Sequence, residues 1–442
     1  MSGISPIRTG RRSTIPPMTP SDHQVAAGTD EQSGAPTPLP VVIATMLRPT
    51  DFGGVHTHVQ QILSYLKTEG MNGTLITPFS WSRLATYPAF APRIIFERVS
   101  GSASVAWYRF WHEFFLRKAL HRHLAEIGEC VIYAQGPQEA RAALRARRGP
   151  YQRVIMAVHY KVSQADEWVN RIRGAIKRDS AVFRMVRRAE RETIPSVDGI
   201  VFVSEWARFG VLTWLPEAAA VPYSIIGNFM TSMDYKPGQE LRGDLVSVGG
   251  LDLAKNHRFL LEVLAAAKQA GRPLTLDLFG EGPLRRNLEQ QASSLGLELQ
   301  VRFHGFRRDV RDFLSGYRAY VHASYADTSS FAIIEAMAAG LPIVAARIGG
   351  IPELFDDGVE GRFWSLDDPA EAAAVLLELL DVESTSNMAG KAARERFSRQ
   401  FDSTVTAPRL LSFLYGGVPA GATEPNSENR SAASFVIDSR LR

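Results

Sequence analysis

This sequence lacks several common features, and each absence excludes a class of protein. A single cysteine, Cys130, has no partner for an intrachain disulfide, which excludes a disulfide-stapled scaffold and favours a reducing cytosol. No run of about 18 apolar residues is present to span a bilayer, and the basic N-terminus has no apolar segment of the secretory kind. We therefore expect a soluble, cytoplasmic protein.

An excess of charge of one sign is also missing. The 442 residues carry a formal net charge of +4 and the pI is near 9.1, which is too mild to indicate nucleic-acid binding but suits an anionic substrate or membrane surface. Aromatic residues are absent from the first 40 positions, which hold seven prolines. We expect this tail, and the similar last 25 or so residues, to be disordered because neither can bury enough apolar surface.

Between the tails, short β-branched runs alternate with segments of helical period. Strands are predicted at 40–45, 73–77, 130–134, 153–159 and 199–204, and then at 244–250, 274–280, 300–305, 319–324 and 342–346. This alternation predicts right-handed crossovers and parallel, doubly wound sheets. The predicted fold class is α/β, with two Rossmann-like domains facing each other across a cleft. The predicted boundaries are a disordered tail at 1–39, an N-terminal domain at 40–225, a linker at 226–243, a C-terminal domain at 244–400, a helix packing back on the N-terminal domain at 401–416, and a disordered tail at 417–442.

Ligands of such folds bind beyond the carboxyl ends of the strands, and the most informative loop there is YADTSSFAIIEAMAAGLPIVA (325–345). Its helix is stopped by Gly340 and Pro342. The candidate N-caps are Thr328, Ser329 and Ser330. Free backbone N–H groups near Ser330 to Ala332, together with the helix dipole, make a natural diphosphate site.

Two carboxylates flank that site. Asp327 precedes the helix and Glu335 lies in its second turn, so the two could grip different hydroxyls of one sugar nucleotide. The alternative is a capping aspartate and a solvated glutamate. The helix around Glu335 is otherwise apolar, which favours a functional role because a buried carboxylate needs a partner.

This loop resembles the E-x7-E signature of retaining GT-B glycosyltransferases, particularly family 4 (glycosyl transferases group 1), with aspartate in the first position. Other segments resemble the family in the same order, so that the resemblance covers about residues 40–415. They are GGVHTHVQQIL (53–63), AVHY (157–160), VSEWAR (203–208), VGGLDLAKN (248–256), LFGEGPLRRNLE (278–289), VRFHGF (301–306) and RIGGIPELFDDGVEGRFW (347–364).

The resemblance implies a UDP- or GDP-sugar donor held mainly by the C-terminal domain. Lys255 would contact the diphosphate and stabilise charge on the leaving group. Glu335 would hold the ribose, Asp327 the transferred sugar, and His159 would contact that sugar near the bond being broken. The other implied donor-binding residues are Gly53 and Gly54 and Ser329, Ser330, Phe331 and Ala332 near the phosphates, and Gly305 and Phe306 beside the base. For His56 and His58, a functional role and a purely structural role are both left open.

No D-x-D triplet occurs, so no metal site of that kind is predicted, and no cofactor is expected. Lys255, the helix N-terminus and backbone N–H groups would replace the metal. No motif for a general base is visible, which is compatible with a front-face retaining reaction in which the leaving phosphate takes the acceptor proton.

Four positions depart from the family pattern. Gly250 stands where an arginine usually precedes the lysine, which removes one of two phosphate cations, and Asp327 is one methylene shorter than glutamate. Phe229 and Tyr160 replace a usual glycine and a frequent aspartate. The arginines that could compensate for Gly250 are Arg285, Arg307 and Arg347.

The segment WYRFWHEFFLRKALHRHLAEI (107–127) has helical period, aromatic residues and several basic residues, among them Arg109, Arg117, Lys118 and Arg122. Such a helix could lie in a membrane interface, or it could simply cover the N-terminal sheet.

The predicted function is therefore transfer of a sugar, with retention, from a nucleotide-diphosphate sugar to a glycan or lipid-linked acceptor in cell-surface polysaccharide or glycolipid assembly. The expected location is the cytoplasm or the inner membrane face. The alternatives are a non-catalytic nucleotide-sugar-binding pseudo-glycosyltransferase and a GT-B nucleotide-sugar epimerase. A dinucleotide oxidoreductase is disfavoured because G-x-G-x-x-G is incomplete.

Overall fold

The computed structural model describes residues 38–417, apart from 49–52, 93–95, 97–99, 172–175, 179 and 233–239. Nearly all of both predicted tails, 1–37 and 418–442, lies outside the described residues, as does part of the predicted linker.

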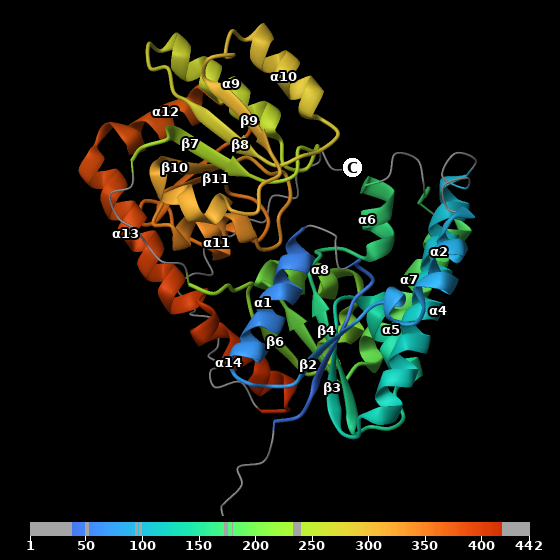
Figure 1. Ribbon diagram of the computed structural model, residues 1–442. Helices are drawn as coiled ribbons and strands as arrows, with labels where there is room; N and C mark the ends of the chain where they lie inside the picture. The colour runs from blue at the N-terminus through green and yellow to red at the C-terminus, as the bar shows by residue number, and fades with distance from the viewer. Residues whose placement is uncertain are drawn as a thin grey trace, which may run out of the picture. The chain divides into compact units, whose positions relative to one another are not determined.

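The first domain is built on a six-stranded parallel sheet with the order β2-β1-β3-β4-β5-β6 (Figure 1). Its strands are β1 (Val41–Ala44), β2 (Gly73–Ile76), β3 (Cys130–Ala134), β4 (Gln152–Val158), β5 (Gly199–Phe202) and β6 (Tyr223–Ile225). The central strands are apolar runs buried on both faces, as a parallel sheet between helix layers requires. The edge strand β6 was not predicted, because only three residues pair and they carry no alternation.

Helices cover both faces of this sheet. They are α1 (Gly54–Thr68), α2 (Arg83–Phe90), α4 (Gly101–Glu126), α5 (Pro137–Ala146), α6 (Gln164–Arg171), α7 (Ala181–Thr193) and α8 (Glu205–Trp214), with short 3₁₀ turns η1 (Pro78–Ser80), η2 (Ile194–Ser196) and η3 (Pro216–Ala220). One face packs against α4, α5 and α8. The other face packs against α1 and against α14 (Ser403–Leu414) from the far end of the chain.

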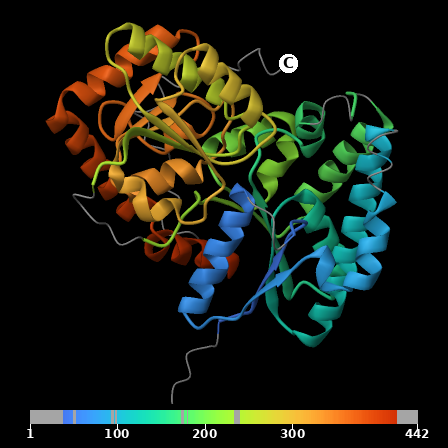
Figure 2. The same ribbon diagram turned by 45° about the horizontal axis from the view of Figure 1, so that its top comes forward.

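The second domain repeats this plan with the order β12-β11-β10-β7-β8-β9, again all parallel (Figure 2). Its strands are β7 (Gly243–Val248), β8 (Leu276–Phe279), β9 (Val301–Gly305), β10 (Tyr317–His322), β11 (Ile343–Ala346) and β12 (Gly361–Trp364). The two sheets confirm the predicted α/β class with paired doubly wound domains. The unpredicted strand is β12, a four-residue edge strand inside a segment rich in turn residues.

Its helices also form two layers. They are α9 (His257–Gln269), α10 (Arg285–Ser294), α11 (Phe331–Ala338), α12 (Pro369–Asp381) and α13 (Glu383–Gln400), with the 3₁₀ segments η4 (Val310–Gly316) and η5 (Ile351–Glu353). One core joins the sheet to α9, α10 and α12, and the other joins it to η4, α11 and α13. The segment at 310–316 is therefore a 3₁₀ helix, not the α-helix that its period favours.

The chain then returns to the first domain. After α13, Asp402 caps α14 by accepting a hydrogen bond from Thr404 N at 2.9 Å. Leu410 and Leu414 of α14 are buried in the same core as Val41 and Tyr133 of the first sheet. A helix packing back on the N-terminal domain was predicted for 401–416, and Figure 1 shows α14 beside α1.

The long aromatic and basic helix is α4. It packs against α5 and η1, and Leu116 and Leu120 are buried in the core under the sheet. Arg109, one of the basic residues named for this segment, is buried and donates to Gln164 Oε1 at 3.1 Å, so it is not available to a membrane surface. No helix in the described part of the chain is both long and apolar enough to cross a membrane.

Candidate active site

The site of the second domain forms where the strand order reverses. Strands β7 and β10 are neighbours although the strands β8 and β9 lie between them in sequence, so the loops after their carboxyl ends meet. Ala254 O, in the loop after β7, accepts hydrogen bonds from Tyr325 N at 2.8 Å and Ser324 Oγ at 2.9 Å, both in the loop after β10. These two hydrogen bonds hold the loop that carries Lys255 next to the loop that carries Asp327.

Lys255 and Asp327 form an ion pair at the mouth of this crevice. Lys255 Nζ lies 2.7 Å from Asp327 Oδ2, and the two side chains are 28% and 12% exposed. His322 Nε2, at the end of β10, lies 3.3 Å from the same oxygen. Burial alone would raise the pKa of Asp327, but the charge of Lys255 and the adjacent His322 hold it well below its ordinary value. Asp327 is thus ionised at neutral pH and keeps Lys255 in place.

The turn at Gly349 and Gly350 supports the chain at Asp327. Gly350 N donates to Asp327 O at 2.9 Å, and a Cβ on Gly349, which has φ of +64°, would lie 2.2 Å from that same carbonyl oxygen. Only glycine allows this close approach. The pair of glycines in RIGGIPE is therefore explained by packing against the loop that carries Asp327.

The N-terminus of α11 follows directly. Ser330 is its N-cap residue, but none of the predicted hydroxyls caps the helix. Thr328 Oγ1 instead donates to His159 O of the first domain at 2.9 Å. The first N–H groups of α11 have no acceptor within the helix, as at any helix start. They remain available to an anion beside Lys255.

Glu335 lies one turn further along α11 and is half-buried. Burial raises its pKa to about 7, and the nearby charge of Arg311 lowers it only partly. Arg311, on η4, is the charged partner that the sequence did not identify; its guanidinium also donates to Thr231 O at 2.9 Å. Glu335 therefore changes charge near neutral pH.

The first domain contributes two neutral histidines. His159, after β4, is half-buried, and its Nε2 lies 3.1 Å from Gln135 Oε1 at the end of β3. Burial and then the neighbouring His58 lower the pKa of His159 well below its ordinary value. The two rings meet edge to face with centroids 4.8 Å apart. At neutral pH, Nε2–H of His159 donates to Gln135, and its Nδ1 carries a lone pair.

His58 belongs to a hydrogen-bonded chain between the domains. Its Nδ1 donates to Asn228 Oδ1 at 3.1 Å, its Nε2 accepts from the Tyr133 hydroxyl at 3.2 Å, and burial lowers its pKa to about 4. Asn228 Nδ2 donates to Ser329 O at 2.8 Å, in the loop before α11. The chain links β3 and α1 to the candidate phosphate loop. Asn228 was missed because a lone asparagine after a short strand carries no distinctive sequence signal.

The remaining implied donor residues lie at the edges of this crevice. Gly54, at the start of α1, faces the Phe331 ring, which would lie 3.9 Å from a Cβ at that position; Gly53 is its N-cap residue with φ of +142°. Gly305, at the end of β9, has φ of +72°, and Phe306 after it is 48% exposed. In the sheet, the strand β9 that carries Gly305 is separated from β7, which precedes the loop of Lys255, by β8.

The three arginines considered as substitutes for the missing cation are engaged elsewhere. Arg285 pairs with Glu281 at 2.6 Å and Glu289 at 2.9 Å. Arg307 pairs with Asp309, and Arg347 lies over the Phe363 ring, 3.6 Å from Asp357. A Cβ at Gly250 would lie 3.3 Å from Asp252 Oδ2, a tight contact that a small shift of that side chain relieves, and 3.8 Å from Glu281 O. Within the described ranges, no three metal-ligating side chains gather in one place.

Residues 242–382 match the family model of glycosyl transferases group 1. The matched residues belong to the second domain. The D-inositol 3-phosphate glycosyltransferase of Corynebacterium kroppenstedtii is 33% identical over 179 residues, which are 38% of this chain and 39% of that protein. The chain spans between 33% and 39% of the length of the first curated relatives it matches.

Solved structures match over both domains. HepE of Anabaena, crystallised with UDP, has a TM-score of 0.62 at 17% identity, covering 86% of this chain and 99% of HepE. Sucrose-phosphate synthase of Thermosynechococcus elongatus has a TM-score of 0.65 at 17% identity, covering 85% and 98%. The likeness shows that the predicted GT-B fold is correct.

Proposed function

We propose that this chain, which has a GT-B fold and a match to glycosyl transferases group 1 at residues 242–382, is a retaining glycosyltransferase that uses a nucleotide-diphosphate sugar. One observation carries the proposal. The Lys255–Asp327 ion pair lies where the ends of β7 and β10 meet, and Asp327 stands in the loop that leads directly into α11, whose first N–H groups have no acceptor within the helix. This arrangement offers a cation and backbone donors to a single diphosphate.

The charged side chains of the second domain indicate how the donor would be held. Lys255 supplies the positive charge that a nucleoside diphosphate leaving group needs, and Asp327 Oδ2 holds the ammonium group in place. Asp327 Oδ1 remains to accept a hydroxyl of the transferred sugar. Glu335, when ionised, accepts the two hydroxyls of the ribose. The UDP seen with HepE supports a uridine nucleotide as the first donor to test.

The acceptor side lies in the first domain, beside His159. Because His159 is neutral and its Nε2 is held by Gln135, it orients the donor sugar and does not serve as a cationic acid. The acceptor hydroxyl attacks the anomeric carbon from the face that the diphosphate leaves. The carbon–oxygen bond to the diphosphate breaks, and the acceptor proton passes to the departing phosphate oxygen. This route needs no protein base and no metal ion.

The acceptor class that we propose is a glycan or a lipid-linked sugar in cell-surface polysaccharide or glycolipid assembly. Phe110, which is 62% exposed on α4, and the exposed Lys118 support contact with an anionic membrane surface. The protein would then act in the cytoplasm, at the inner face of the membrane.

A panel of UDP- and GDP-sugars, with EDTA throughout, tests the function. We expect one or more donors to raise the melting temperature, to turn over with a glycan or lipid-linked acceptor, and to give a product whose anomeric proton signal shows retention. Turnover that strictly requires Mg²⁺ or Mn²⁺ would refute the metal-free route. Binding of a donor without turnover would favour the pseudo-glycosyltransferase.

A further inference from the structure

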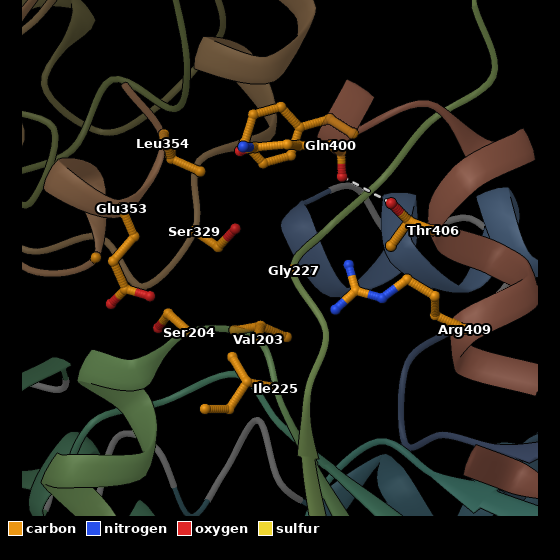
Figure 3. A pocket seen from close by; sticks show the side chains of 12 residues that line it. Val203, Ser204, Ile225, Gly227, Ser329, Glu353, Leu354, Gln400, Thr406 and Arg409 are labelled. Atoms are coloured by element: carbon orange, nitrogen blue, oxygen red, sulfur yellow. Dashed lines mark hydrogen bonds between the residues drawn. The ribbon is translucent and has the colours of Figure 1, made fainter. Parts of the chain in front are cut away.

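A cavity of about 260 Å³ shares one residue, Ser329, with the implied donor-binding set and is otherwise lined by different residues (Figure 3). It is bounded by the ends of β5 and β6, the loop before α11, η5, and the junction of α13 with α14. The site residues Lys255, Asp327, Glu335 and His159 do not line it. It has room for several waters or one small ligand, since a water occupies about 30 Å³ in the liquid.

One wall carries a cation with no partner among the described residues. Arg409, on α14, is exposed, and the structure records no hydrogen bond or ion pair to its guanidinium within the described part of the chain. Figure 3 shows this guanidinium directed from α14 toward Gly227 and the cavity. A guanidinium offers a planar fork of N–H donors that matches an oxyanion.

The wall opposite carries a buried hydroxyl that is equally unused. Ser329 is 9% exposed, and its Oγ has no hydrogen-bond partner among the described residues. Its carbonyl oxygen is already bound by Asn228, but its hydroxyl points into the cavity in Figure 3. Buried hydroxyls nearly always have a partner, so an orphan one indicates a missing ligand or water.

The cavity also holds one acidic residue, Glu353, whose pKa burial raises to about 7. Glu353 accepts hydrogen bonds from Glu205 N and Trp206 N, both at 2.8 Å, so its carboxylate is matched to the N-terminus of α8. Ser204 Oγ accepts from Ala207 N at 3.2 Å and keeps its own proton to donate. Arg409 and the hydroxyls of Ser329 and Ser204 therefore each keep hydrogens to donate into the cavity.

We propose that this cavity binds a small phosphate-type oxyanion, either free phosphate or a phosphomonoester. Arg409 would supply the charge, and the hydroxyls of Ser329 and Ser204 would donate to the remaining oxygens. Such a ligand bridges α14, which packs on the first sheet, to the loop that precedes α11 in the second domain. It would hold that loop from the side opposite the donor.

Isothermal titration of the full chain with inorganic phosphate and, separately, glycerol 3-phosphate tests the proposal. UDP at saturating concentration keeps both probes out of the donor site, and chloride at equal ionic strength serves as the blank. We expect one of the two probes to bind, and the stronger one identifies the source of the phosphate group. Arg409→Gln should weaken that binding by about tenfold or more, the loss expected for a charged hydrogen-bonding group, and Ser329→Ala should weaken it less.

Arg191→Gln is the matched control, because Arg191 is an exposed arginine on α7, far from the cavity in sequence and fold. It should bind the probe like the wild-type protein. Absence of binding by both probes would overturn the proposal. So would binding that Arg409→Gln retains but Lys255→Ala loses, since that places the phosphate in the donor site. UDP binding by Arg409→Gln confirms that the variant is folded and keeps this test separate from the proposed transferase function.

Discussion

At the scale of single residues, the site depends on which charges are fixed and which can change. Asp327 is held ionised by Lys255, whereas Glu335 is half-buried with only the charge of Arg311 to offset the burial. Two carboxylates eight positions apart thus have opposite pKa shifts. The sequence predicted both as ligands of one donor but carried no information on this difference, because Arg311 and His322 approach from other elements.

Glu335 predicts a pH dependence of donor binding. Its pKa of about 7 means that it is protonated below neutral pH and ionised above, and only the ionised form accepts both ribose hydroxyls. The dissociation constant of a nucleotide sugar should therefore fall by up to about tenfold between pH 6 and pH 8. Titration calorimetry at several pH values measures this. Glu335→Gln should bind with little pH dependence; an equal slope in that variant would assign the titration to another group.

Replacing Gly250 by arginine is expected to strengthen nucleotide binding. An arginine can be placed there if the Asp252 side chain, 3.3 Å from the Cβ position, shifts slightly, and the backbone φ is not in the left-handed region. The added guanidinium would supply the second phosphate cation that the family pattern has at this position, so Gly250→Arg should tighten UDP binding by roughly tenfold. Gly250→Ala, which adds the Cβ alone, is the control and should bind as the wild type does. Weaker binding by Gly250→Arg would show that Gly250 is needed for close approach of the ligand.

At the scale of secondary-structure elements, strands with a strong apolar run were predicted close to their true limits. The two edge strands β6 and β12 were missed, because three or four residues with one buried face leave little pattern to read. The segment at 310–316 has helical period but closes as a 3₁₀ turn. Contacts with residues distant in sequence determine whether such short segments form a strand or a helix. The local sequence carries no information on those contacts.

We predict that the exposed face of helix α4 contacts anionic membranes. Its inner face is committed to the core, so that only an outer strip with Phe110 and Lys118 could touch lipid. Anionic liposomes should float the protein at low salt, and the double change Phe110→Ser with Lys118→Ser should reduce the floated fraction several-fold. Met388→Ser with Lys391→Ser, an exposed apolar and basic pair on α13, is the matched control. If the wild-type protein does not float, α4 only covers the sheet.

At the scale of the whole molecule, the alternation of strands and helices was enough to predict two doubly wound domains. The rule that ligands bind beyond the carboxyl ends of the strands, together with the family resemblance, pointed to the loop at 325–345. The contacts between domains were not predictable. The hydrogen bonds from Thr328 to His159 O and from Asn228 to Ser329 O join residues more than 100 positions apart. Those bonds place the neutral His159 opposite the phosphate loop, which makes one site from two halves.

The central claim is that Lys255 stabilises the leaving diphosphate, and the turnover number of Lys255→Ala tests it most directly. With the donor and acceptor found in the nucleotide-sugar panel, kcat should fall by about a hundredfold or more, equivalent to about 2–3 kcal/mol of transition-state stabilisation. Lys391→Ala, which removes an exposed lysine on α13, should leave kcat unchanged. A Lys255→Ala variant that folds, binds donor and turns over at the wild-type rate would contradict the account.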